Sequence, residues 1–306
     1  MHPAPSIIVF TTLSGLGYGL AALLGLGLLD PSLVATKIAH VLALLLIGAG
    51  LISSTLHLGN PQRAWRALSQ WRSSWLSREG VMAMLTFVPL IWSAWASVIE
   101  GRYLALPGLL GTLFAGITVY CTAMIYASLK SVQAWNTPLT PLCYLLFAAS
   151  GGALLGLFFT AASGGPLLLL SAMAVVFTAA AWTAKLAWRR NMEAMAPLST
   201  PESATGLGGI GKVRLFERPH MTENYLTREM GFRIARKHAG KLRQLSLLSG
   251  GVLPAAIALV LAGSDGGWIA ALAMALAVAA HVVGMLAERW LFFAEARHAV
   301  MNYYGG

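Results

Sequence analysis

Charged residues are scarce in this chain, and their scarcity excludes a soluble protein. Asp, Glu, Lys and Arg make up only 10% of the 306 residues, whereas 57% are hydrophobic, and the mean hydropathy is +0.70. A soluble domain of this length cannot hide so much apolar surface from water. Acidic residues are the scarcer kind, and the net charge is +10. No nucleic-acid-binding fold accompanies this charge, so we interpret it as facing membrane lipids and partner proteins.

Cysteine is also nearly absent, which argues against two kinds of redox centre. Cys121 and Cys143 are the only two cysteines, and they do not form a CxxC pair. Iron–sulfur clusters and covalently attached haem both need closely spaced cysteines. We therefore expect no iron–sulfur cluster and no covalent haem on this chain, and we interpret both thiols as small buried residues.

Long apolar segments are what the chain has in abundance. Eight of them reach about 20 residues, the length that spans a bilayer; they run over residues 6–29, 33–56, 80–99, 104–126, 140–162, 166–188, 246–264 and 267–292. We predict an all-α integral membrane protein with eight transmembrane helices in two four-helix bundles, residues 1–139 and 140–306. The first segment is expected to be retained, because its apolar run is too long for a signal peptide and no Lys or Arg precedes it.

The basic residues are divided unequally between the two sides of the predicted bundle. Of the twenty-one Lys and Arg residues, only Lys37 and Arg102 fall on the side of the loops after segments 1, 3, 5 and 7. The other nineteen fall on the opposite side, many of them in the long basic loop 189–245. Cytoplasmic loops of membrane proteins carry the excess of Lys and Arg. This distribution therefore predicts that both termini and all large loops are cytoplasmic.

Two histidines lie well inside apolar segments and raise the question of haem b, which would need a pair of them. Counted from the periplasmic ends at about 1.5 Å per residue, His40 is roughly 10 Å deep and His281 roughly 20 Å. Ligands at such different depths do not easily share one iron, unless the helices tilt. We favour a structural role for both, with haem ligation or a role toward protons or quinone as the alternatives. A haem-bearing quinone oxidoreductase is therefore kept as a rival hypothesis. A solute transporter is the other rival, but we find no pair of Gly/Pro-broken helices with midplane charges.

The loop between the second and third segments, residues 57–79, gathers ionisable groups at the membrane boundary. His57 ends one predicted helix and Glu79 begins the next, with Arg63 between them. Ionisable groups at a membrane edge are functional candidates, and these three have the chemistry to bind a polar carbonyl ring and to move two protons. The alternative is structural: His57 and Glu79 stabilise helix ends, and the arginines bind lipid phosphate. The residues alone leave both hypotheses open.

Several motifs resemble those of the dimethyl sulfoxide reductase anchor-subunit family, and together they cover essentially the whole chain. They are residues 54–65 (STLHLGNPQRAW), 74–79 (SWLSRE), 126–130 (YASLK), 134–140 (AWNTPLT) and 288–298 (ERWLFFAEARH). The eight-helix layout is similar too. The resemblance implies a membrane anchor for a molybdopterin catalytic subunit and a four-cluster iron–sulfur subunit. It also implies exchange of electrons with the quinone pool, either ubiquinone or menaquinone, without haem.

The family's quinone-site His, Gly, Arg and Glu match His57, Gly59, Arg63 and Glu79 in this chain. By this resemblance all four residues bind quinone. We further expect Glu79 to relay protons and His57 to assist catalysis. Trp65 and Arg66 are candidate neighbours of that site. No metal site is expected on this chain.

The charge distribution departs from one feature of the family. Its reductase anchors have their N-terminus outside, whereas the basic residues here predict an N-terminus inside a bacterial inner membrane. That orientation suits the branch of the family that serves cytoplasmic sulfite oxidation, which we favour. The alternative is the anchor of a dimethyl sulfoxide-type reductase that oxidises quinol.

The long basic loop has two expected parts. Residues 196–211 are rich in Pro, Gly, Ser and Thr and are expected to be irregular. Residues 222–245 have the pattern of a basic amphipathic helix, lying either on lipid or against the iron–sulfur subunit. Residues 225–229 (YLTRE) echo residues 75–79 (WLSRE), which is compatible with a duplication of four helices but too short to establish one.

Overall fold

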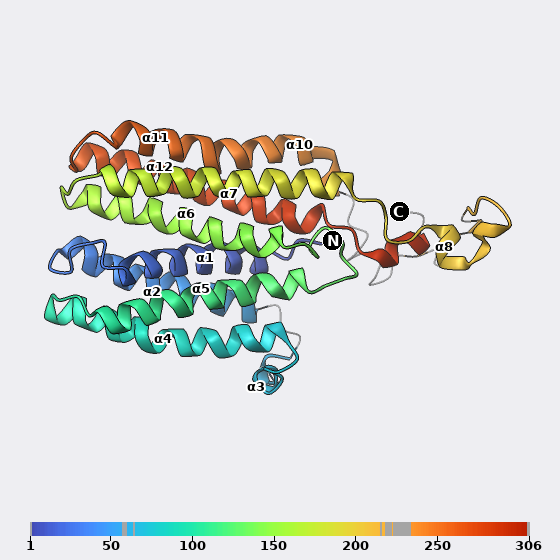
Figure 1. Ribbon diagram of the computed structural model, residues 1–306, viewed down its shortest axis with the longest axis horizontal. Coiled ribbons are helices and arrows are strands. Elements are labelled where there is room, and N and C mark those ends of the chain that lie inside the picture. Colours follow the sequence, from blue (N-terminus) through green and yellow to red (C-terminus); the bar gives the residue numbers. More distant parts are fainter. Residues whose placement is uncertain are drawn as a thin grey trace.

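The protein is a bundle of long, roughly antiparallel helices in the computed structural model, which describes residues 2–56, 60–63, 65–214, 216–217, 222 and 234–304 (Figure 1). Eight helical spans among these residues are long and apolar enough to cross a membrane. Seven are α1 (Pro5–Gly25), α2 (Val34–Thr55), α4 (Trp75–Glu100), α5 (Ala105–Ala127), α6 (Leu139–Ala162), α7 (Leu168–Ala194) and α12 (Trp268–Ala294). The eighth runs through α10 (Ile234–Leu247), η3 (Leu248–Val252) and α11 (Leu253–Leu261). The predicted all-α membrane fold is therefore confirmed.

Three of the spans extend beyond their predicted ends at one end of the bundle. Helix α4 begins at Trp75, not near residue 80, because the Ser74 side chain accepts a hydrogen bond from the Ser77 backbone N–H and caps the helix there. Helix α7 continues to Ala194 and α12 to Ala294. The helices thus project past their apolar centres on the side that carries both termini (Figure 1).

The eighth span contains a π-helix, η3, between α10 and α11. A π-helix is rare and usually occupies a single turn within an α-helix. Here it coincides with Gly250 and Gly251, and Gly250 packs directly on Gly284 of α12. A side chain on Gly250 or Gly284 would collide with the facing helix, so the two backbones approach as closely as glycine allows.

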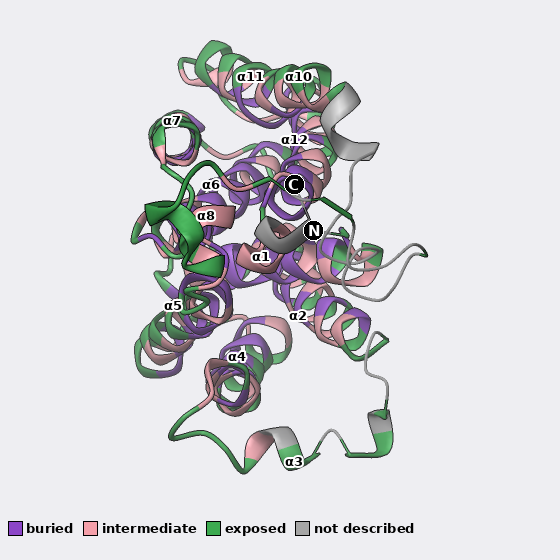
Figure 2. Ribbon diagram, turned by 90° about the vertical axis from the view of Figure 1, so that its right-hand side faces the viewer, coloured by how far each residue is buried: buried purple, intermediate pink, exposed green. Residues whose placement is uncertain are grey.

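Helix α1 occupies the centre of the bundle. It packs against α2 and α5 on one side and against α6 and α12 on the other, and Figure 2 shows it between these two groups of helices. Its contact with α6 is built on Gly19 and Gly152, since a Cβ atom on either residue would overlap the other helix's backbone. Because α1 joins both groups, the division into two four-helix bundles stays a prediction.

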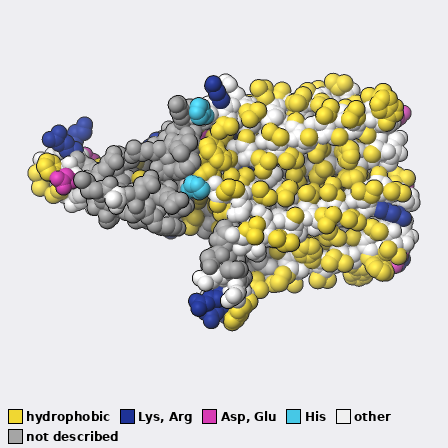
Figure 3. Space-filling view, turned by 180° about the vertical axis from the view of Figure 1, so that it is seen from behind, with side chains coloured by type: hydrophobic (Ala, Val, Ile, Leu, Met, Phe, Trp, Pro, Cys, Tyr) yellow, Lys and Arg dark blue, Asp and Glu magenta, His cyan; other side chains and the backbone are white. Residues whose placement is uncertain are grey.

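The surface of the spans is apolar, and the described charges lie mainly at the two ends (Figure 3). Lys37 and Arg102 lie at the end with the short loops, as the sequence indicated. The other end carries both termini and the short helices η1 (Pro61–Arg63), α3 (Trp65–Leu68), α8 (Pro201–Thr205), η2 (Leu207–Gly209) and η4 (Ala299–Tyr304). Lys185, Arg189 and Arg289 differ from this pattern, because they are buried within the helices.

The loop after α7 is more regular than its composition indicated. The prediction that residues 196–211 are irregular is wrong in part, because α8 and η2 form there. Thr200 and Ser203 make a reciprocal capping box at the start of α8. The described part of residues 222–245 from residue 234 onward is helical, as predicted, and continues into the eighth span. Residues 225–229, whose sequence is similar to the first residues of α4, lie outside the described residues.

The contact between α1 and α6 generates a stability prediction. Gly19→Ala should lower the free energy of unfolding by about 1–3 kcal/mol, because the new methyl group overlaps the Ala148 carbonyl oxygen. Gly15→Ala on the same helix is the matched control, since a Cβ atom there would meet no neighbouring atom within 4 Å. Thermal unfolding of both purified variants in detergent checks this, and equal midpoints would contradict the close packing.

Candidate functional site

Glu79 lies one turn inside α4 with its side chain turned into the bundle. It is only 6% exposed, and its carboxylate accepts a hydrogen bond from the Thr122 hydroxyl of α5. The sequence placed Glu79 at the start of the helix, which is wrong because Ser74 caps the helix five residues earlier. The alternative that Glu79 stabilises the free N–H groups of a helix start therefore loses its structural basis.

The neighbourhood of Glu79 consists of hydroxyl groups and aromatic rings. Tyr18, Tyr126 and Tyr144, from α1, α5 and α6, all lie close enough to interact with its charge. No Lys or Arg in the described part of the chain forms an ion pair with it. Glu288 shows the usual arrangement, because that buried carboxylate is paired with Lys185 and Arg289. A buried acid with only a hydroxyl partner is costly, and such groups in membranes are characteristic of function.

Arg63, the second predicted site residue, is placed in η1 and is exposed. It forms neither a hydrogen bond nor an ion pair with Glu79 in the structure. Trp65 and Arg66 follow in α3, also exposed, with the Arg66 guanidinium 5.5 Å from the centre of the Trp65 ring. His57 and Gly59 lie outside the described residues. The structure thus positions Glu79 in the core and the described loop residues at the surface, without bringing Arg63 into contact with Glu79.

Arg78 organises the end of this loop, a role that sequence reasoning did not find. Its guanidinium donates to the Trp71 and Arg72 carbonyl oxygens at 3.0 and 2.7 Å, and it covers the Trp75 ring at 4.2 Å. The Trp75 ring in turn meets Tyr120 of α5 edge-on, with 5.9 Å between ring centres. These contacts hold the loop against α4 and α5, immediately before Glu79. They also occupy the Arg78 guanidinium, the nearest cation to Glu79 in sequence.

Large apolar side chains surround the loop on its exposed side. They are Leu56, Trp65, Trp71 and Leu76, each between 51% and 77% exposed. Tryptophan is enriched where transmembrane helices end, at the membrane–water boundary. The loop therefore presents an apolar rim with cationic groups beside it, a chemistry that fits an amphipathic, lipid-soluble molecule with a polar head.

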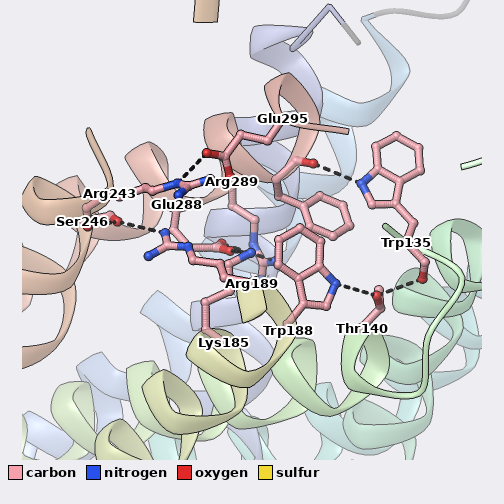
Figure 4. A network of polar contacts seen from close by, with 11 residues as sticks. Trp135, Thr140, Lys185, Trp188, Arg189, Arg243, Ser246, Glu288, Arg289 and Glu295 are labelled. Atoms are coloured by element: carbon pink, nitrogen blue, oxygen red, sulfur yellow. Dashed lines mark hydrogen bonds and ion pairs between the residues drawn. The ribbon is translucent and has the colours of Figure 1, made fainter. Parts of the chain in front are cut away.

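A second polar cluster lies between α7, α10 and α12, and Figure 4 shows its contacts. Lys185 pairs with Glu288 at 2.6 Å, and Arg243 bridges Glu193 and Glu295 at 2.7 and 2.6 Å. The Lys185 ammonium also lies 3.7 Å from the centre of the Trp188 ring. Each charge here has a partner of opposite sign, so we interpret the cluster as structural. Lys185 is one of the nineteen basic residues counted on the side opposite Lys37 and Arg102. The sequence did not show that it is buried, because an apolar run does not reveal which helix face is buried.

Three of the five motifs that carry the family resemblance, residues 126–130, 134–140 and 288–298, meet beside this cluster. The Trp135 indole donates to the Phe292 carbonyl oxygen at 3.0 Å, and the two rings stack with centres 5.3 Å apart. The Tyr126 ring packs on both, edge to face. Thr140 bonds to the Trp135 carbonyl oxygen and accepts from Trp188. Motifs far apart in the sequence thus form one aromatic core near the end with both termini.

The two intramembrane histidines line different cavities. His40 borders a small cavity between α1, α2, α4 and α5, whereas His281 borders another between α1, α5, α6 and α12. Among the described residues, no group of three or more His, Cys, Asp or Glu side chains is arranged to hold a metal ion. Cys121 and Cys143 are buried free thiols.

Comparison with known proteins gives consistent matches. The family model described as the dimethyl sulfoxide reductase anchor subunit matches residues 1–201. A sulfite dehydrogenase subunit of Allochromatium vinosum is 33% identical over 99% of both proteins. An anaerobic dimethyl sulfoxide reductase subunit of Escherichia coli is 29% identical over 49% of this protein and 55% of its own length. Its namesake in Haemophilus influenzae is 32% identical over 36% of this protein and 40% of its own length. No solved structure matches this protein.

Proposed function

Because this protein belongs to the dimethyl sulfoxide reductase anchor-subunit family, we propose that it is the membrane anchor and quinone-reactive subunit of a three-subunit oxidoreductase. The proposed partners are a four-cluster iron–sulfur subunit and a molybdopterin catalytic subunit. In this arrangement the soluble subunits carry the metal chemistry, and this protein binds the quinone substrate, ubiquinone or menaquinone. Reduction of a quinone consumes two electrons and two protons, so the anchor has to supply a binding site and a route for protons.

The observation that carries this proposal is the buried carboxylate of Glu79. It lies near the predicted membrane boundary, it has a hydroxyl partner and no cation partner among the described residues, and the exposed apolar rim of the loop is close to it in sequence. A carboxylate in such a position can take up and release a proton, as an acid–base group must. In our proposal Glu79 exchanges protons with the quinone oxygens and with the cytoplasmic side.

His57, Gly59 and Arg63 are the proposed binding residues. His57 donates a hydrogen bond to one quinone oxygen, and Gly59 leaves room for the ring beside the backbone. Arg63 is always charged and stabilises negative charge that develops on the headgroup. Its exposure leaves the guanidinium free to turn toward a ligand. Trp65 and Arg66 are proposed as flanking contacts, because they are exposed next to Arg63.

Sulfite oxidation in the cytoplasm is the reaction we favour for the complete complex. Two observations support it: a relative that matches nearly the full length of this protein is a sulfite dehydrogenase subunit, and the basic residues gather at the end with both termini. A dimethyl sulfoxide-type reductase, which would oxidise quinol, is the second candidate, supported by the partial matches to the reductase subunits.

The proposed orientation in the bacterial inner membrane can be tested with reporters. Fusions to the C-terminus should be active only when the reporter works in the cytoplasm, because nineteen of the twenty-one basic residues lie on that side. A reporter after residue 102, in a loop at the opposite end, serves as the control and should be periplasmic. A C-terminal fusion active only in the periplasm would contradict the orientation and remove the reason to prefer sulfite oxidation.

Glu79→Gln should assemble normally yet lose most quinone-linked turnover, by about 100-fold, because the amide keeps the size and the bond to Thr122 but carries no exchangeable acid proton. Turnover in membranes is compared with activity toward an artificial dye, which bypasses the anchor. Glu100→Gln, at the opposite end of α4, is the matched control and should behave like the parent. Normal quinone turnover by an assembled Glu79→Gln complex would show that the carboxylate is structural.

His57→Ala and Arg63→Ala should each weaken the binding of quinone-analogue inhibitors by about 10-fold, which corresponds to about 1.4 kcal/mol. Dye-linked activity of the soluble subunits should remain unchanged, since these side chains are proposed to contact only the quinone. Arg72→Ala, in the same loop, is the control for a general loss of positive charge. If both variants bind the inhibitor like the parent, the ring binds elsewhere.

A further inference from the structure

A small cavity, lined by both apolar and polar side chains, lies in the centre of the bundle, where α1, α5, α6 and α12 meet. Its volume is about 20 Å³, which is enough for a water molecule and too little for a quinone ring. Arg289 lies five residues from the end of α12 and His281 near its middle. The α12 residues that line the cavity therefore lie between roughly 8 Å and roughly 20 Å from the end that carries both termini.

Four of the residues that line this cavity carry a buried polar atom without a partner among the described residues. Thr12 Oγ1, Tyr144 OH, His281 Nε2 and Arg289 Nε are all buried, and none has a hydrogen-bond partner among the described residues. Buried polar atoms are almost always hydrogen-bonded, to protein or to ordered water. Four such atoms surround a space that is large enough for a water molecule. Water is therefore the ligand that fits this cavity.

His281 is held in a defined orientation by the π-helix. Its Nδ1 lies 2.7 Å from the Gly250 carbonyl oxygen within η3. A carbonyl oxygen only accepts, so Nδ1 carries the proton and Nε2 of the neutral ring presents a lone pair. The close approach of Gly250 and Gly284 brings this carbonyl group next to α12. The fold therefore leaves the basic nitrogen of His281, a residue that lines the cavity, without a partner among the described residues.

Thr122 connects the cavity to Glu79. Its side chain lines the cavity, and its hydroxyl has two acceptors beside it, the Glu79 carboxylate and the Thr118 carbonyl oxygen, the latter at 3.1 Å. A hydroxyl group can accept one proton while it gives up another. Thr122 is thus the link between the buried acid of the proposed quinone site and the atoms around the cavity.

We propose that this cavity is a hydrated proton-transfer chamber that links Glu79 to His281. Protonated Glu79 gives its proton to the Thr122 oxygen, the Thr122 proton passes to a cavity water, and a proton of that water passes to His281 Nε2. One proton has then moved, leaving a Glu79 carboxylate and a His281 imidazolium, and every hydroxyl and water is restored. This inference rests on the proposed role of Glu79 and adds His281, Thr122 and bound water to that site.

The charged and titratable groups that face this path come from several helices. Arg289 and Tyr144 line the cavity with His281, and the guanidinium of Arg289 lies 3.9 Å from the centre of the Tyr144 ring. Glu288 pairs with Arg289 and partly offsets its charge. Tyr18 of α1 lies close enough to Glu79 to interact with its charge. In this environment Tyr144 and Arg289 anchor the water, and His281 and Glu79 exchange the proton.

The first experiment measures hydration directly, by X-ray hydroxyl-radical footprinting of the intact complex in membranes. Radicals form from bound water and oxidise neighbouring side chains. Met285 lines the cavity, whereas Met274 on the same helix is buried and does not line it. Met285 should be oxidised several-fold faster than Met274. Equal rates would overturn the chamber, whatever the role of Glu79.

The second experiment measures proton transfer through Thr122 and His281 in the assembled complex. Thr122→Val and His281→Gln should each slow quinone-linked turnover about 10-fold or more and raise its solvent isotope effect. Thr122→Ser, which keeps the hydroxyl, should restore both to the parent values. Thr178→Val is the control, because Thr178 pairs with Ser150 between α6 and α7, away from the cavity.

Binding of a quinone-analogue inhibitor separates the two proposals. Parent-like inhibitor affinity in slow Thr122→Val and His281→Gln complexes supports the chamber, since the quinone site is then intact. Parent-like turnover in either variant overturns the proton path. Equal loss in Thr122→Val and Thr122→Ser also overturns it, because packing alone then explains the loss. If Glu79→Gln turns over normally, the proposed quinone site fails, and the Met285 footprint still decides whether the cavity is hydrated.

Discussion

The hydrocarbon core of a membrane offers no hydrogen-bonding partner, so each polar group that enters it must be satisfied within the protein. This constraint explains why the described spans are helical and why the buried cations cluster. Lys185 meets Glu288 where both are buried and an unpaired charge would be costly. Arg243, which is about one-third exposed, adds bonds to Glu193 and Glu295, so α7, α10 and α12 are joined. Buried acids without a charged partner, and buried polar atoms without a hydrogen-bonded partner, among the described residues are therefore informative.

Glu79 and the cavity beside His281 are two such cases, and Thr122 connects them. The ion cluster and the aromatic core of Trp135 and Phe292 lie around them as a rigid frame. Helix α1 completes the arrangement, because its contact with α6 through Gly19 and Gly152 brings the helices that line the cavity together. The groups that we propose to move protons are thus surrounded by side chains with defined partners.

Much of the fold was predictable because it follows from composition along the sequence. Eight apolar segments predicted eight spans, and the positions of Lys37 and Arg102 matched the short-loop end. The start of α4 was missed, since the capping serine at Ser74 lies outside the apolar run. Short α8 was missed for a similar reason: its capping box depends on two specific side chains within a Pro- and Gly-rich stretch.

For the candidate site, the sequence by itself determined the residue types, the number of spans and the side of the bundle on which loop 57–79 lies. Motif resemblance selected Glu79 and Arg63, but not their surroundings. Only the tertiary structure decided that Glu79 points inward to Thr122, that Lys185 is buried against Glu288, and that His281 faces a cavity. The physical reason is that a uniformly apolar helix has no face marked for burial, so its rotation and its partners are set by packing against the other helices.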